Sequence, residues 1–134
     1  MTTATTDELA VRHVIEDWAA AVRRKDFPAI LLHHARDMWM FDVPPPLQSK
    51  GLDEYRGTWD LFFTWAGEPV TFDIVEMRVF AGRDVAFAAA LMRCSSTETD
   101  GRRISLDFRL TVGLQKVGEQ WTIVHEHHSI PSTS

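Results

Sequence analysis

The sequence predicts an α+β fold in which the helices come first and an antiparallel sheet follows. Apolar residues recur at helical spacing in the first half of the chain, whereas the second half holds long stretches rich in β-branched and aromatic residues. Glycine-containing segments separate these stretches at 81–84, 97–101 and 117–119, as tight hairpins require. Helices segregated from an antiparallel meander make an α+β domain. No repeat or linker interrupts the pattern, so we predict one domain over residues 1–134.

The helices are predicted at residues 6–24, from Asp26 or Phe27 to His34, and at Gly51–Ala66. In the third helix, Tyr55 and Trp59 lie one turn apart, and one side of this helix should roof a cavity. Met38–Val43 alternates loosely and is predicted as a short strand, which Pro44 and the next two prolines end. His33 and His34 then fall at the exposed end of a helix, where we expect no functional role.

Four strands are predicted in the second half, at Val70–Phe80, Val85–Ser95, Arg103–Val117 and Gln120–Ile130. Pairing of Val117 with Gln120 would set the register of the last hairpin. In that register Leu110 lies opposite His127, so His125 and His127 share the apolar face of the sheet. A bulge would reverse this assignment, because it shifts the alternation of side chains by one residue.

The preceding turn, centred on Gly101, predicts that Arg93 lies roughly opposite Phe108 and shares that apolar face. An arginine there is costly unless it meets an anion. It could pair with Asp42, hold an anionic group of a ligand, or reach solvent at the strand end. The opposite, polar face would carry Asp107, Arg109, Thr111, Gln115, Glu126 and His128.

Composition excludes several classes of function. The 134 residues are 45% hydrophobic and 25% charged, and the net charge of −5 argues against binding to nucleic acid or to anionic membranes. No apolar run is long enough to span a membrane, and the N-terminus lacks a basic region followed by an apolar one. The single Cys94 excludes an internal disulfide framework and fits a cytoplasmic location.

The end of the chain is its most informative segment. Residues 121–124 are aromatic or β-branched, and three histidines follow within four positions. Alternate residues of a strand share a face, so Trp121, His125 and His127 would lie together on the wall of a cavity. Two imidazoles there can orient a ligand or move protons near neutral pH. A metal site with Asp42 as third ligand is the least favoured alternative, because no cysteine or carboxylate cluster accompanies them.

Three stretches together resemble the nuclear transport factor 2-like superfamily, which includes ketosteroid isomerase, the SnoaL-like polyketide cyclases and the association domain of calcium/calmodulin-dependent protein kinase II. They are Trp18–Asp42, Asp84–Arg93 and Gly118–Pro131. The resemblance implies a cone-shaped, curved antiparallel sheet wrapped around three helices, with a central pocket. It also implies a homodimer through the outer face of the sheet. Fold alone does not fix function, since this superfamily hosts enzymes, binding proteins and assembly modules.

The resemblance also implies roles for single residues. Asp42 corresponds by position to the general base of ketosteroid isomerase, and a desolvated carboxylate at a pocket mouth can gain basicity. Trp18 aligns roughly with the phenolic donor of that enzyme, and Leu110 lies near its protonated acid. Neither Trp18 nor Leu110 can replace those groups, which argues against true ketosteroid isomerase activity.

The candidate catalytic residues are Asp42, His125 and His127, and the candidate substrate-binding residues are Trp18, Tyr55, Trp59, Arg93 and Leu110. We predict an enzyme of the isomerase, cyclase or dehydratase type that uses neither cofactor nor metal and removes a proton next to a carbonyl of an apolar substrate. The alternatives are a ligand-binding protein without chemistry and an assembly module. The expected partners are a small apolar molecule and a second copy of the chain, with no nucleic acid and no membrane.

Overall fold

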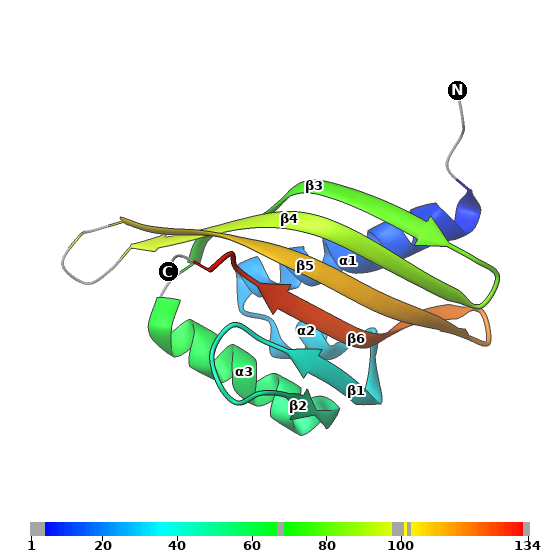
Figure 1. Ribbon diagram of the computed structural model, residues 1–134, viewed down its shortest axis with the longest axis horizontal. Coiled ribbons are helices and arrows are strands. Elements are labelled where there is room, and N and C mark those ends of the chain that lie inside the picture. The colour runs from blue at the N-terminus through cyan, green and yellow to red at the C-terminus, as the bar shows by residue number, and fades with distance from the viewer. Residues whose placement is uncertain (1–4, 67–68, 98–100, 102, 133–134) are drawn as a thin grey trace.

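The computed structural model describes residues 5–66, 69–97, 101 and 103–132. Its helices are α1 (Thr6–Arg24), α2 (Phe27–Leu31) and α3 (Gly51–Ala66), and its strands are β1 (His34–Phe41), β2 (Ser49–Lys50), β3 (Pro69–Ala81), β4 (Val85–Thr97), β5 (Arg103–Val117) and β6 (Gln120–Ser129). The strands form one curved sheet in the order β2-β1-β6-β5-β4-β3, and the helices cover its concave face (Figure 1). The predicted α+β class is confirmed.

Helix α1 begins and ends where its sequence signals predict. The Thr5 side chain caps the N-terminus by accepting a hydrogen bond from the Glu8 amide at 3.0 Å. At the other end Lys25 adopts a left-handed conformation with φ of 55°, which satisfies the last carbonyl groups. The apolar face of α1 packs against β3. This packing fixes Trp18 in the core, where its side chain is 3% exposed.

Strand β1 begins earlier than predicted, and its pairing with β6 is parallel. It begins at His34 rather than Met38, because α2 ends at Leu31. It also lies parallel to β6, with Phe41 beside His127 at its end. The meander of β3 to β6 is antiparallel as predicted, whereas β1 extends it by a parallel pairing. His34 is therefore buried in the sheet, and its predicted exposure at a helix end is wrong.

The last hairpin contains a bulge that reverses the predicted faces of β6. Val117 pairs with Gln120 as predicted, but the register shifts between Gly113 and Leu114. Leu110 consequently lies opposite His128 rather than His127. One extra residue in a strand moves every later side chain to the other face. The predicted inward direction of His125 and His127 is therefore wrong.

The β4–β5 hairpin also differs from the prediction by one residue. Arg93 lies opposite Asp107, not Phe108, and its Nε donates to Asp107 Oδ1 at 2.8 Å. Both side chains are exposed on the outer face of the sheet. Arg93 thus finds its anion within the chain, away from the core and from Asp42. The outer position of Asp107, Arg109, Thr111 and Gln115 is confirmed, whereas Glu126 and His128 lie on the inner face.

Candidate functional site

A cavity of about 390 Å³ opens between α3, the end of β1 and the inner face of the sheet. Its wall is mostly apolar and rich in aromatic rings. The lining residues are Met40, Asp42, Val43, Pro44, Thr58, Trp59, Leu61, Phe62, Trp65, Phe72, Cys94, Leu106, Phe108 and His128. The size and chemistry are those of a small-molecule site, with few polar groups set among apolar ones.

His128 is the imidazole that reaches this cavity. Its ring stacks on Phe108 with centroids 5.5 Å apart and meets the edges of Trp18 and Trp59. Its Nε2 hydrogen-bonds Glu126 Oε1 at 2.9 Å. The aromatic rings hold the imidazole plane and the carboxylate fixes its rotation, so the orientation of His128 is set before any ligand binds.

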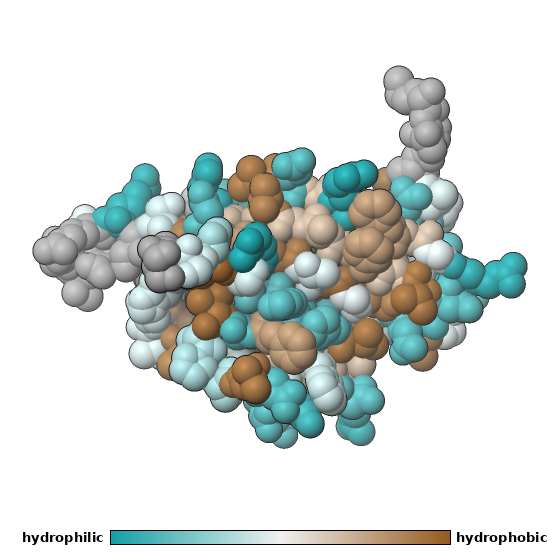
Figure 2. Space-filling model, in the orientation of Figure 1, coloured by the Kyte–Doolittle hydropathy of each residue, from teal (hydrophilic) through white to brown (hydrophobic). Residues whose placement is uncertain are grey.

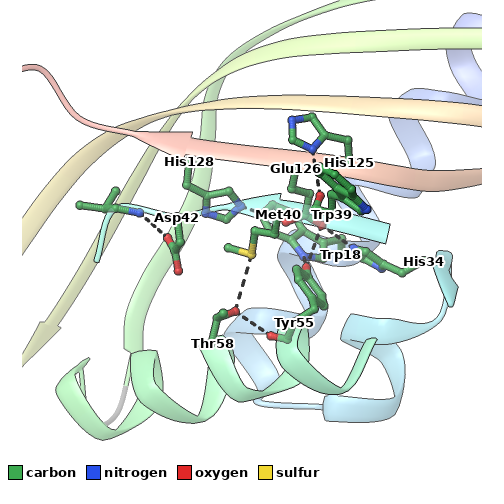
Figure 3. A network of polar contacts seen from close by, with 11 residues as sticks. Trp18, His34, Trp39, Met40, Asp42, Tyr55, Thr58, His125, Glu126 and His128 are labelled. Carbon is green, nitrogen blue, oxygen red and sulfur yellow. Dashed lines mark hydrogen bonds and ion pairs between the residues drawn. The ribbon is translucent and has the colours of Figure 1, made fainter. Parts of the chain in front are cut away.

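Glu126 is a buried carboxylate held by three donors (Figure 3). Its Oε1 accepts from His128, whereas its Oε2 accepts from the hydroxyl of Tyr55 at 2.8 Å and contacts Nε2 of His34. The residue is only 1% exposed. A buried charge without such partners would be strongly unfavourable, so these contacts explain why a glutamate is stable here.

The same contacts set the ionisation of Glu126. Burial by itself would raise its pKa, but the charge of a protonated His34 and the hydrogen bonds from His128 and His34 outweigh burial and lower the pKa from 4.5 to about 2. Glu126 is thus ionised at neutral pH and can only accept hydrogen bonds. Both imidazoles must therefore donate through Nε2, which leaves Nδ1 of each ring as the second nitrogen.

The two histidines differ at Nδ1. In His34 this atom is buried and has no hydrogen-bond partner in the described part of the chain. A proton at this atom would be a buried donor without an acceptor, so Nδ1 of His34 forms no part of the hydrogen-bond network around Glu126. His128 lines the cavity instead. It is the member of the cluster that can exchange a proton with a bound molecule.

Tyr55 and Trp18 extend the hydrogen-bond network of Glu126 into the core. Nε1 of Trp18 donates to the Tyr55 hydroxyl at 2.9 Å, and that hydroxyl donates to Glu126. Burial and the charge of Glu126 raise the pKa of Tyr55 well above its usual value, so the hydroxyl keeps its proton. Tyr55 is the only tyrosine of the chain. Because its hydroxyl is committed to these contacts, no phenol faces the cavity.

Asp42 lies at the mouth of the cavity, just after β1. Its Oδ1 accepts a hydrogen bond from the Val43 amide at 2.8 Å, which leaves Oδ2 for other partners. The side chain is half-buried and forms no ion pair in the described part of the chain. Figure 3 shows Asp42 and His128 on the same side of α3, and both line the cavity.

The structure thus divides the residues predicted from the sequence into three groups. Asp42 and Trp59 line the cavity, whereas Trp18, Tyr55 and Leu110 are buried behind its wall. Arg93, His125 and His127 lie on the outer face of the sheet. Nδ1 of His125 there donates a hydrogen bond to the Trp39 carbonyl, and the ring contacts Phe41.

Sequence reasoning missed the His34, Glu126 and His128 cluster. One signal could have indicated it. Gly113 stands alone within a long β-rich stretch, and an isolated glycine in a strand often marks a bulge. A bulge opposite Gly113 would have placed Glu126 and His128 on the inner face.

Comparison with known proteins identifies the family. Residues 11–133 match the family model of the SnoaL-like domain. The chain belongs to the SnoaL-like domain family. The resemblance drawn from the sequence is confirmed. A comparison with curated proteins gave no significant match.

Solved structures show the same fold. A nuclear transport factor 2-like protein of unknown function from Pseudomonas putida KT2440 is 34% identical, with a TM-score of 0.83 over 97% of this chain and 90% of that one. A candidate dehydratase from Streptomyces avermitilis is 14% identical, with a TM-score of 0.81 over 95% of this chain and 99% of that one. A candidate ketosteroid isomerase from Shewanella frigidimarina is 19% identical, with a TM-score of 0.76 over 90% and 94%.

Two further observations concern metals and membranes. Within the described residues no group of three or more histidine, cysteine, aspartate or glutamate side chains is arranged to hold a metal ion. No helix in the described ranges is both long and apolar enough to cross a membrane.

Proposed function

We propose that this SnoaL-like protein is a cofactor-independent enzyme that moves a proton next to a carbonyl of an apolar, ring-sized substrate. The observation that carries the proposal is the Glu126–His128 pair at the wall of an aromatic cavity. A carboxylate that accepts one imidazole N–H leaves the other ring nitrogen available as a general base, and this imidazole lines the cavity. Asp42 supplies a second proton-transfer group in the same cavity.

The reaction assigns a role to each group. Nδ1 of His128 takes the proton from the carbon beside the carbonyl, and the electron pair of the broken C–H bond moves to the carbonyl oxygen as an enolate. The charge of Glu126 stabilises the imidazolium that forms. Return of the proton to another carbon gives isomerisation. Loss of a β-hydroxyl group, which takes the proton from the His128 imidazolium and leaves as water, gives dehydration. Attack of the enolate carbon on a second carbonyl gives cyclisation.

Cys94 also lines the cavity, but it is not a suitable nucleophile. Burial, and to a lesser degree the charge of Asp107, raise the pKa of its thiol to about 11. The reactive form of a cysteine is the thiolate, and at neutral pH Cys94 remains a thiol. Covalent chemistry through this residue is therefore disfavoured relative to acid–base chemistry.

The proposal is tested by deuterium exchange. Tetralone, an aromatic ketone of suitable size, is incubated with the protein in D2O, and loss of the proton signal next to the carbonyl is followed by NMR. We expect exchange above the buffer rate with the wild type, strongly reduced by His128→Gln and reduced by Asp42→Asn. Exchange no faster than in buffer would contradict enolisation of this class of ketone, and exchange unchanged in His128→Gln would contradict the assigned base.

One observation favours a second candidate, a binding protein without chemistry. The Tyr55 hydroxyl is committed to Glu126 and Trp18, so the cavity lacks a phenolic donor for an enolate oxygen. In that case tetralone would bind, as shown by quenching of tryptophan fluorescence, and would not exchange its protons.

We also propose a homodimer through the outer face of the sheet. Large apolar side chains are exposed there, and they include Trp39, Phe80, Val85, Phe87 and Leu91. Figure 2 shows apolar side chains on the surface among hydrophilic ones. The rings of Phe80 and Phe87 stack with centroids 4.7 Å apart. Sedimentation should give a dimer for the wild type and a monomer for Phe87→Glu; a wild-type monomer would contradict the proposal.

A further inference from the structure

A second cavity of about 230 Å³ adjoins the first at its mouth. Asp42, Pro44, Thr58 and Leu61 line both cavities. Figure 3 shows Asp42 and Thr58 on facing elements, at the end of β1 and on α3. A molecule seated in the aromatic cavity can therefore extend past Asp42 into the second one.

The second cavity is lined by a hydroxyl that forms no hydrogen bond with the described residues. This hydroxyl belongs to Ser49, which is only 5% exposed. Its oxygen is not among the described buried atoms that lack a partner, so it remains accessible and can hydrogen-bond a group bound in the cavity. Gly57 also lines the cavity, and a Cβ atom there would meet nothing within 4 Å.

The lining of the two cavities includes carboxylates and, among the described residues, no lysine or arginine. Asp42 and Glu54 line the second cavity. Glu54 accepts the Lys50 amide through Oε1 at 2.8 Å, while the Lys50 ammonium lies over the Trp39 ring, 4.5 Å from its centroid. Each carboxylate keeps one oxygen without a hydrogen bond in the described part of the chain. An anionic group would be repelled here, and a cation attracted.

We propose that the second cavity is a subsite for an ammonium group at the end of an elongated ligand whose aromatic body fills the main cavity. Asp42 and Glu54 accept hydrogen bonds from the ammonium group, and the Ser49 hydroxyl receives the partner that it lacks. The aromatic walls of the main cavity suit the ring system. This inference deepens the proposed function by naming the class of substrate, an aromatic carbonyl compound with an amine.

Binding is tested separately from chemistry with three probes that differ only in their end group: naphthylbutylamine, naphthylbutanol and naphthylbutyrate. Calorimetry at neutral pH should show that the amine binds about tenfold more tightly than the alcohol, and the acid most weakly. Equal affinities for the amine and the alcohol, or tighter binding of the acid, would overturn the proposal.

Two variants locate the ammonium group. Glu54→Gln should weaken amine binding about threefold, because Glu54 is exposed and its charge is screened, and it should leave the alcohol unchanged. Asp53→Asn is the matched control, since it removes the same charge from the next residue of α3 outside both cavities. If both variants weakened amine binding equally, the effect would come from the net negative charge of α3, and the subsite would be contradicted.

Gly57→Leu tests the space itself, because Gly57 lines the second cavity and a Cβ atom there would meet nothing within 4 Å. It should reduce binding of all long probes while Gly57→Ala does not. If Gly57→Leu, folded by circular dichroism, binds the amine as the wild type does, the ligand does not occupy this cavity. Tetralone exchange by the wild type is measured separately. If the protein prefers the amine probe but does not exchange the protons of tetralone, only the proposed function is contradicted. If it exchanges those protons but does not prefer the amine probe, only the subsite is contradicted.

Discussion

Both faces of β6 carry histidines, and the two faces have opposite environments. On the inner face Glu126 and His128 are buried, hydrogen-bonded to each other and, at His128, open to the aromatic cavity. On the outer face His125 and His127 contact Phe41 and border solvent. Adjacent histidines in one strand thus differ in environment because of the face on which each lies. The presence of a histidine alone does not indicate its environment. The register of the strand determines on which face each side chain lies.

The largest expected effect compares neighbouring histidines. His128→Gln should reduce tetralone exchange by about 100-fold or more, because general-base catalysis typically contributes that factor. His127→Gln makes the same chemical change one residue away on the outer face and should leave exchange within about twofold of the wild type. NMR rates in D2O measure both. Equal losses in the two variants would break the distinction between the faces.

A second prediction compares carboxylates on the two faces of the sheet. Glu126→Gln places an amide N–H₂ or a weaker acceptor against His34 and His128, so it should lower the free energy of unfolding by about 1–3 kcal/mol. Asp107→Asn removes an exposed partner of Arg93 and should change stability little. Urea titrations followed by tryptophan fluorescence provide the comparison. If Asp107→Asn lowered the free energy of unfolding more than Glu126→Gln does, the buried cluster would not contribute more to stability than the exposed ion pair.

Acid should act through the same cluster. The pKa of Glu126 falls from 4.5 to about 2 on folding, because the contacts with His34 and His128 outweigh burial. A lowered carboxyl pKa contributes stability that is present above the unfolded pKa and is lost as the pH falls toward the folded one. The wild type should therefore lose about 3 kcal/mol from this group between about pH 5 and pH 2.

Glu126→Gln has no carboxyl group to titrate at this position, so its stability should fall less steeply over the same range. Urea unfolding at several pH values gives both curves, and the difference between them removes the contribution of other carboxylates such as Asp7. Parallel curves would mean that the pKa of Glu126 is not lowered by folding.

Local sequence patterns were sufficient for much of the fold. The bounds of α1 and α3 follow from helical spacing and caps, and β5 begins and ends where predicted. The direction of His34 could not be predicted in this way, because it depends on the parallel pairing of β1 with β6, between segments far apart in the chain. Likewise, the buried cluster joins His34, Tyr55 and Glu126 from three elements that no local pattern connects.

The bulge itself offers the smallest and most discriminating prediction. Gly113 lies opposite His125 beside the register shift, and a Cβ atom there would meet the Cβ of His125 at 3.6 Å, an ordinary contact. We expect that the extra residue Val124 creates the bulge and that the bulge does not require a glycine at position 113. Gly113→Ala should then leave the free energy of unfolding unchanged or raise it by about 0.5 kcal/mol, because alanine restricts the unfolded chain more than glycine does. Tetralone exchange should also persist, because the faces of β6 would not change. A clear loss of both stability and exchange would show instead that the glycine maintains the register, and that the position of His128 in the cavity depends on the backbone of β5.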